Sequence, residues 1–284
     1  MRIKIQNNEL IAEFNSKGAE LQSLKSCRSQ RDYIWEGNPE IWGKHAPILF
    51  PIVGTLKENQ YHYKNKIYAS PRHGFARDMV FEVISVSLHS VVFSLKANAQ
   101  TKEIYPFDFE LQIDYSLIKN NLEINYHVIN HDCERMPFSI GGHPAFATPK
   151  NFDSYSLEFE ESENLESYTL ENDLLSNTTV TIPINDRKLP LTYRLFEKDA
   201  LIFKKLNSKR ISLLEENEPI LHFHFENFKN FGIWTKINAP FICLEPWLGY
   251  SDLAASDGNI ENKEGILFLE AGKTFKCCYR IEII

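Results

Sequence analysis

Two short segments each place a titratable side chain in an unusual local setting. His143 follows two glycines and precedes Pro144, so the glycines permit uncommon backbone angles and the proline favours an extended His143. Glu245 follows the apolar run 242–244, where a carboxylate is costly to bury unless it has a partner. An imidazole and a carboxylate together can act as general acid and general base. The structural interpretations are equally open: a turn-capping histidine and a strand-end glutamate bonded to backbone.

Other residues have the chemistry to hold a polar ligand. Arg72, His73 and Arg77 lie within six residues, next to a glycine, and could bind hydroxyls or an anion, although a surface turn has the same composition. Asp199 precedes an apolar run and could bond hydroxyl groups, but an Asp turn is the simpler interpretation. Trp247, two residues after Glu245, could form the wall of a sugar pocket.

Composition narrows the function classes. The 284 residues carry a net charge of −7 without a basic stripe, which disfavours nucleic-acid binding. No stretch approaches the roughly 18 apolar residues of a membrane span. The five cysteines form no C-x-x-C pair, and the N-terminus lacks the apolar core of a signal peptide, so we expect a cytoplasmic protein. Dinucleotide, Walker and nucleophile-elbow motifs do not occur, and we expect no cofactor and no metal.

Two histidines are separated by a single residue on an expected strand. His222 and His224 share a strand face through their H-x-H spacing, which can hold a metal ion. No third ligand lies at a recognisable spacing. Two solvent-facing histidines on a half-buried strand are therefore the preferred interpretation.

Period-two alternation of apolar and polar residues dominates the chain. It predicts a hairpin of strands over 109–117 and 122–128, and further strands over 91–95, 221–225 and 275–284. Many short strands without helical periodicity predict an all-β sandwich, here as a single domain over 1–284. The polar stretch 160–177 looks like a surface excursion, with a short helical or irregular segment over 161–176.

Taken together, these segments resemble the aldose 1-epimerase (galactose mutarotase) family, and most of all its LacX-like branch. The similarity covers essentially the whole chain. It runs through these segments, in order: 47–54, 72–77, 141–146, 199–203, 232–235 and 239–249. The resemblance implies an antiparallel β-supersandwich with a sugar site in a cleft on one sheet.

The resemblance also implies residue roles. His143 matches the family's acid and Glu245 its base. His73 matches a histidine that holds substrate hydroxyls, Asp199 matches the substrate-binding aspartate, and Arg77 assists. Many galactose mutarotases carry an arginine soon after the first glycine turn, but residues 54–57 of this chain read Gly-Thr-Leu-Lys.

The missing arginine leaves the substrate open, and Lys57 and Arg72 are the candidates to replace it. The expected activity is interconversion of the α and β anomers of a galactose- or glucose-type aldose. In that reaction Glu245 is ionised and His143 is protonated by virtue of a neighbouring carboxylate. Three alternatives remain: a hexose-6-phosphate mutarotase, a non-catalytic carbohydrate-binding protein of the same fold, and a metal enzyme using the H-x-H pair. The partner implied is a small-molecule sugar.

Overall fold

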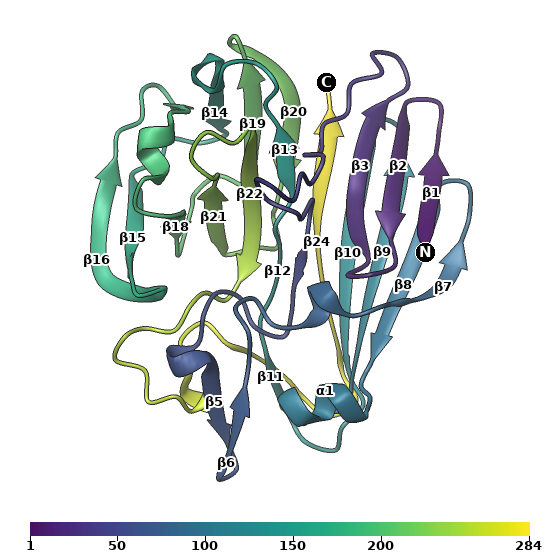
Figure 1. Cartoon of the computed structure of the whole chain (residues 1–284), viewed down its shortest axis with the longest axis vertical. Helices are drawn as coiled ribbons and strands as arrows, with labels where there is room; N and C mark the ends of the chain where they lie inside the picture. Colours follow the sequence, from purple (N-terminus) through teal and green to yellow (C-terminus); the bar gives the residue numbers. More distant parts are fainter.

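Alternating apolar and polar residues build the largest sheet of the protein, whose computed structural model describes residues 1–284 (Figure 1). The expected hairpin forms with Leu122 opposite Leu117 and Val128 opposite Leu111, which keeps the apolar side chains on one face. The nine strands are, in sheet order, β17 (Lys188–Pro190), β14 (Tyr155–Phe159), β19 (Arg210–Glu215), β20 (Glu218–His224), β24 (Thr274–Ile283), β10 (Asn121–Asn130), β9 (Phe109–Ile118), β8 (Ser90–Lys96) and β7 (Glu82–Val86).

A second, eight-stranded sheet lies against part of this sheet and carries Glu245 and Trp247 on β22, with His143 in the connection between β12 and β13. Its order is β16 (Leu174–Ile182), β15 (Leu165–Glu171), β18 (Leu201–Phe203), β21 (Asn230–Trp234), β22 (Phe241–Leu248), β12 (Ile140–Gly142) and β4 (Ile48–Leu49), with β13 (Ala145–Ala147) also paired to β22. Phe223 of the first sheet meets Phe146 and Phe231 of the second at ring-centroid distances of 5.8 and 6.1 Å. The expected all-β sandwich is therefore confirmed.

Smaller elements complete the molecule. An N-terminal three-stranded sheet packs on the first sheet through Phe14 and Tyr115, whose ring centroids are 4.4 Å apart (Figure 1). It comprises β1 (Arg2–Gln6), β2 (Leu10–Asn15) and β3 (Glu20–Ser26), and two-stranded sheets pair β5 (Gln60–Tyr63) with β6 (Lys66–Ala69) and β11 (Met136–Phe138) with β23 (Leu267–Leu269). The helical segments are α1 (Ala99–Ile104) and the 3₁₀ turns Lys57–Asn59, Ala76–Asp78, Phe152–Ser154, Tyr193–Phe196 and Ile260–Asn262. No helix is long and apolar enough to span a bilayer.

The expectation of a helical or irregular segment over 161–176 is wrong for most of that range. Residues 161–164 are irregular, whereas residues 165–176 belong to the hairpin β15–β16 at the edge of the eight-stranded sheet. The fully buried positions of β15 are Leu165 and the polar Ser167, so the sequence shows no clear apolar alternation in this strand. Whether such a polar segment becomes an edge strand depends more on its pairing with a neighbouring strand than on the local propensity of its residues.

His222 and His224 lie on β20 and are half-buried rather than solvent-facing. Nδ1 of His222 is 2.8 Å from Oγ of Ser212, and Nε2 of His224 is 3.0 Å from Oε2 of Glu282. Cross-strand hydrogen bonds therefore account for both rings.

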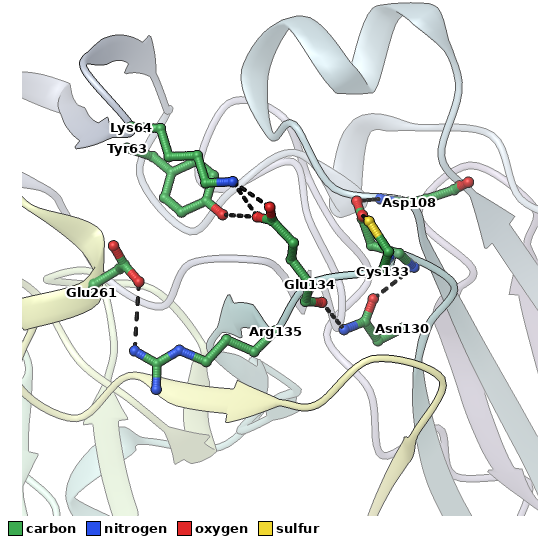
Figure 2. A network of polar contacts seen from close by, with 9 residues as sticks. Tyr63, Lys64, Asp108, Asn130, Cys133, Glu134, Arg135 and Glu261 are labelled. Carbon is green, nitrogen blue, oxygen red and sulfur yellow. Dashed lines mark hydrogen bonds and ion pairs between the residues drawn. The ribbon is translucent and has the colours of Figure 1, made fainter.

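Exposed polar contacts fasten the β5–β6 hairpin to the loop after β10 (Figure 2). Lys64 pairs with the Glu134 carboxylate, which also accepts a 3.0 Å hydrogen bond from the Tyr63 hydroxyl, and Arg135 lies 3.5 Å from Glu261 (Figure 2). Burial, followed by the hydrogen bond to Glu134, raises the pKa of Tyr63 to about 12. Both members of the Lys64–Glu134 pair are largely solvated, so the pair orders the hairpin more than it stabilises the fold.

A buried ion pair secures the two turns that meet at the end of β22. Nζ of Lys263 donates to Oδ1 of Asp252 at 2.8 Å and to the Tyr250 carbonyl at 2.7 Å, and the two charged side chains are only 2% and 4% exposed. Asp252 in turn accepts a hydrogen bond from the Lys57 amide and donates its own amide to the Thr55 carbonyl. The segments 54–57 and 249–252 are therefore held together as one unit.

Replacing Lys263 by methionine is expected to lower the free energy of unfolding by about 3–5 kcal/mol, because it leaves the Asp252 carboxylate buried without its cation. Urea denaturation followed by circular dichroism measures the change. Lys64→Met is the matched control and should have a much smaller effect, since that pair is exposed. Equal losses in the two variants would contradict this account of the buried pair.

Candidate active site

The interrupted pairing beside β22 brings His143 next to Glu245. The C-terminal part of β22 pairs with β12, where Gly141 faces Trp247, and the N-terminal part pairs with β13, where Ala145 faces Cys243. Between these two ladders the chain passes through His143, whose amide donates to the Pro47 carbonyl at 3.0 Å. The break in the ladder thus leaves the His143 side chain beside the middle of β22.

Glu245 is 1% exposed in a strand whose eight residues are all buried. Its Oε2 lies 3.2 Å from Nε2 of His143, itself 8% exposed. On the neighbouring strand β21, Gly232 stands opposite Glu245. A Cβ at Gly232 would lie 2.6 Å from the Trp247 ring, so only glycine leaves the indole its place in the sheet.

The seven residues predicted to be catalytic or substrate-binding all line one cavity of about 720 Å³. That volume is within the roughly 300–1,000 Å³ typical of small-molecule sites. The seven are Arg72, His73, Arg77, His143, Asp199, Glu245 and Trp247. Tertiary structure therefore gathers residues that are up to 175 positions apart in sequence, from residue 72 to residue 247.

Burial opposes charge on the central pair. It raises the pKa of Glu245 well above its usual range, an effect that the nearby Arg72 charge counteracts. It lowers the pKa of His143 to about 3. The ionised glutamate and protonated histidine expected from ordinary pKa values are therefore not the favoured form of the free site. Both shifts favour the uncharged forms, so we assign one proton to the pair, with Glu245 protonated and His143 neutral.

His73 has a defined tautomer. Its Nδ1 accepts a 3.1 Å hydrogen bond from the Gly54 amide, so the ring proton is on Nε2 and is available as a donor. Burial, then the neighbouring His143, lowers the pKa of His73 well below its usual value, which keeps the ring neutral. Its backbone has a positive φ of 67°, a strained conformation typical of functional loops.

The polar rim combines cations and a strained aspartate. Arg72 lies 3.2 Å from Asp173 and 4.0 Å from Asp199, while Arg77 donates to the Arg72 carbonyl at 2.7 Å and so braces this loop. Asp199 adopts a φ of 96° and accepts the amide of the next residue, Ala200, at 2.7 Å, which is a local contact within the bend that precedes β18. The same residue lines the cavity, so the turn and ligand-contact interpretations are compatible.

Lys57 does not replace the missing arginine. Its Nζ donates to the Ser256 carbonyl at 2.9 Å, and it is absent from the cavity lining. Arg72 does line the cavity. The guanidinium group of Arg72 therefore reaches the cavity from residues 72–77 and not from the glycine turn at residues 54–57.

Sequence reasoning missed two tryptophans that frame His143. Trp42 stacks on the imidazole with ring centroids 5.1 Å apart, and Trp234 meets it edge-on at 5.7 Å. Trp234 lies in a segment that carries the family resemblance, whereas Trp42 has no distinctive neighbours in sequence. Two further lining cations, Lys198 and Lys236, were missed as well.

One group of side chains has donor atoms suited to a metal ion. His143, Glu245 and Cys243 each offer one ligand atom, and these atoms lie within 4.8 Å of one another. The group overlaps the central pair and does not include the H-x-H histidines.

The fold and the site are those of a galactose mutarotase-like β-sandwich protein, and comparison with known proteins agrees with this class. The family model described as aldose 1-epimerase matches residues 1–266. The plasmid-borne protein LacX of Lactococcus lactis subsp. lactis is 34% identical over 300 aligned positions, covering 100% of both chains. The chain belongs to the aldose 1-epimerase family.

Two solved structures extend the comparison. A galactose mutarotase related enzyme from Lactobacillus acidophilus is 35% identical with a TM-score of 0.95, over 100% of this chain and 97% of that one. A galactose mutarotase-like protein from Lactobacillus casei ATCC 334 is 31% identical with a TM-score of 0.95, over 100% of both chains. The expected galactose mutarotase-like fold is therefore confirmed.

Proposed function

We propose that the protein interconverts the α and β anomers of a free aldohexose by acid–base ring opening. The observation that carries this proposal is the 3.2 Å contact between His143 Nε2 and Glu245 Oε2 in the wall of the cavity. A pyranose presents its C1 hydroxyl and its ring oxygen side by side, so adjacent acid and base groups match the two atoms that must exchange protons. Membership of the aldose 1-epimerase family supports the same reaction.

The reaction balances with two protein groups. Glu245 takes the proton of the C1 hydroxyl, the C1–O5 bond breaks with its electron pair moving to O5, and His143 gives O5 a proton. The open-chain aldehyde rotates about C1–C2, and the reverse transfers close the ring on the other face. One proton leaves His143 and one arrives on Glu245, so the number of protons on the pair does not change.

Because the pair is buried, the reaction depends on which of its two members holds the proton at the start. Ring opening in this direction needs the proton on His143, whereas desolvation places it on Glu245 in the free site. Transfer across 3.2 Å produces the required form without a proton from solvent. The Arg72 charge favours an ionised Glu245, and the stacked face of Trp42 favours a protonated imidazole, whereas the charges of Arg77 and Arg72 oppose protonation of His143. Sugar hydroxyls donating to Glu245 would add to this effect.

The remaining cavity residues suit a polyhydroxylated ring. Nε2 of His73 is a hydrogen-bond donor, Asp199 offers acceptors, and Arg72 supplies a planar donor group. Trp247, Trp234 and Trp42 provide ring faces for the apolar C–H face of a sugar. Together they would hold the substrate while it is open and prevent loss of the aldehyde.

Glu245→Gln and His143→Asn are each expected to lower kcat/KM for anomer exchange by about 10²–10⁴-fold, the usual contribution of a general acid or base. Polarimetry or NMR exchange on a freshly dissolved α-anomer measures the rate above the spontaneous one. Circular dichroism checks that both variants stay folded. Wild-type rates in either variant would refute the assigned roles, and sugar binding by the wild-type protein without exchange would identify a non-catalytic binding protein.

The pH dependence distinguishes a buried pair from two ordinary side chains. The active form holds one proton, and it is lost on the acid side only when His143 takes up a second proton, near pH 3. On the alkaline side it is lost when Glu245, whose pKa is raised by burial, deprotonates. Catalysed kcat/KM should therefore not rise with pH through the ordinary histidine pKa of about 6.5, because the acid limb lies near pH 3. An inflection near the ordinary histidine value of ~6.5 that disappears in His143→Asn would contradict this expectation.

A second candidate, a hexose-6-phosphate mutarotase, is favoured by one observation. Four cations line the cavity: Arg72, Arg77, Lys198 and Lys236. Arg72 is engaged with two aspartates, Arg77 with Asp78 and a carbonyl, and Lys236 with the Ile41 carbonyl, whereas Lys198 forms no ion pair. Lys198 is therefore the cation that a phosphate would engage.

Comparing galactose and glucose with their 6-phosphates separates the two candidates. We expect kcat/KM for the free hexoses to equal or exceed that for the phosphates, because most cavity cations are already paired with protein groups. NMR exchange on each sugar measures the rates. A preference for phosphates above about tenfold, which is about 1.4 kcal/mol of transition-state binding, would favour the second candidate if Lys198→Met abolishes it.

A further inference from the structure

Cys243 lies directly behind the proposed catalytic pair. It precedes Glu245 by two residues on β22, so the two side chains share a face of the strand. Its thiol is fully buried in an apolar group with Trp35, Ala239 and Phe241, and it does not line the cavity. The acid–base chemistry proposed above makes no use of this thiol.

The three side chains form a compact set of nitrogen, sulfur and oxygen donors. Their ligand atoms, one each from His143, Cys243 and Glu245, are all within 4.8 Å of one another. Around a tetrahedral Zn²⁺, bonds of ~2.0–2.3 Å place ligand atoms roughly 3.3–3.6 Å apart. The 3.2 Å separation of His143 Nε2 and Glu245 Oε2 is already close to that value, whereas the set as a whole spans up to 4.8 Å, so the Cys243 thiol must approach the other two atoms as the ion binds.

A second observation points to a ligand at the same place. Glu245 is 1% exposed, and its Oε2, the atom that faces His143, has no hydrogen-bond partner. Buried polar atoms are nearly always bonded, so an unbonded carboxylate oxygen is an unused acceptor. It is directed into the donor set, where a cation would complete its coordination.

We propose that His143, Cys243 and Glu245 form a site for one borderline-soft divalent cation such as Zn²⁺, which inhibits the protein by occupying both members of the pair. Cys243 and the pair each lose one proton to solvent, so two anionic ligands balance the two charges of the ion. The fourth position faces the cavity. Mg²⁺ prefers oxygen ligands in octahedral geometry and is excluded by this donor set. The inhibition, though not the binding, rests on the proposed function.

Cobalt titration of the chelator-treated full-length protein tests the binding directly. Co²⁺ should bind with one-to-one stoichiometry and produce a thiolate-to-cobalt charge-transfer band, which Zn²⁺ abolishes by displacing it and Mg²⁺ leaves unchanged. Cys243→Ala should lose the band and weaken Zn²⁺ binding by more than the roughly 10–100-fold typical of losing an outer-shell partner. Cys243→Ser retains the size of the side chain and should lose the band as well.

Two control variants make the test specific. Cys277→Ala removes another buried cysteine, on β24 of the other sheet, and should leave the band intact. His222→Ala disrupts the H-x-H pair and should also leave it intact. No charge-transfer band in the wild-type protein, or a band that survives in Cys243→Ala, would overturn the proposal. Loss of metal binding in His222→Ala alone would assign the ion to the other strand and overturn it equally.

Activity measurements separate this proposal from the proposed function. Cys243→Ala should retain anomer exchange and lose its inhibition by Zn²⁺, whereas Cys277→Ala should remain inhibited. A Cys243-dependent cobalt band in a protein without anomer exchange would support the metal site and refute the proposed reaction. Anomer exchange that is equally insensitive to Zn²⁺ in the wild-type protein and in Cys243→Ala would refute the inhibitory site and leave the reaction standing.

Discussion

The contact between His143 and Glu245 requires two titratable groups to share a region from which water is largely excluded. Glu245 occupies the middle of a fully buried strand, and His143 reaches it only because the chain leaves β12 and re-enters the sheet as β13. Two separate charges would be costly there, whereas a pair that keeps one proton is tolerated. The surrounding structure can be understood as the framework that maintains this one-proton pair.

Rigid supports flank the pair. Trp42 and Trp234 restrict the imidazole, and the absence of a side chain at Gly232 seats the Trp247 indole against the sheet. Farther out, Lys263 and Asp252 tie together the turns that contribute Gly54 and Ser251 to the cavity. Geometry at a proton-transfer site matters at the level of tenths of an ångström, so such bracing has a direct chemical consequence.

The polar rim differs from the pattern that the family resemblance led us to expect. Lys57 turns away to the Ser256 carbonyl, and the guanidinium that lines the cavity comes from Arg72. Arg72 is held between Asp173 and Asp199, so its charge is shared with two carboxylates. A rim of this kind favours neutral, hydroxyl-rich ligands, because its strongest donor group is already partly compensated.

The sequence alone determined the class of fold, because period-two alternation is a local property that survives in any register. It also identified the residue types of the candidate site, since glycine, proline and titratable side chains together are unusual in any fold. It failed where burial did not follow hydrophobicity: the polar hairpin β15–β16, and Trp42, whose sequence neighbours are ordinary.

Tertiary structure alone decided which of those residues lie in contact and which of them are protonated. The separation of His143 from Glu245, the neutral tautomer of His73 and the proximity of Cys243 all depend on strand register and burial. Ordinary pKa values predicted a charged pair, and the structure favours a neutral one because desolvation depends on every neighbour in space, not on the neighbours in sequence.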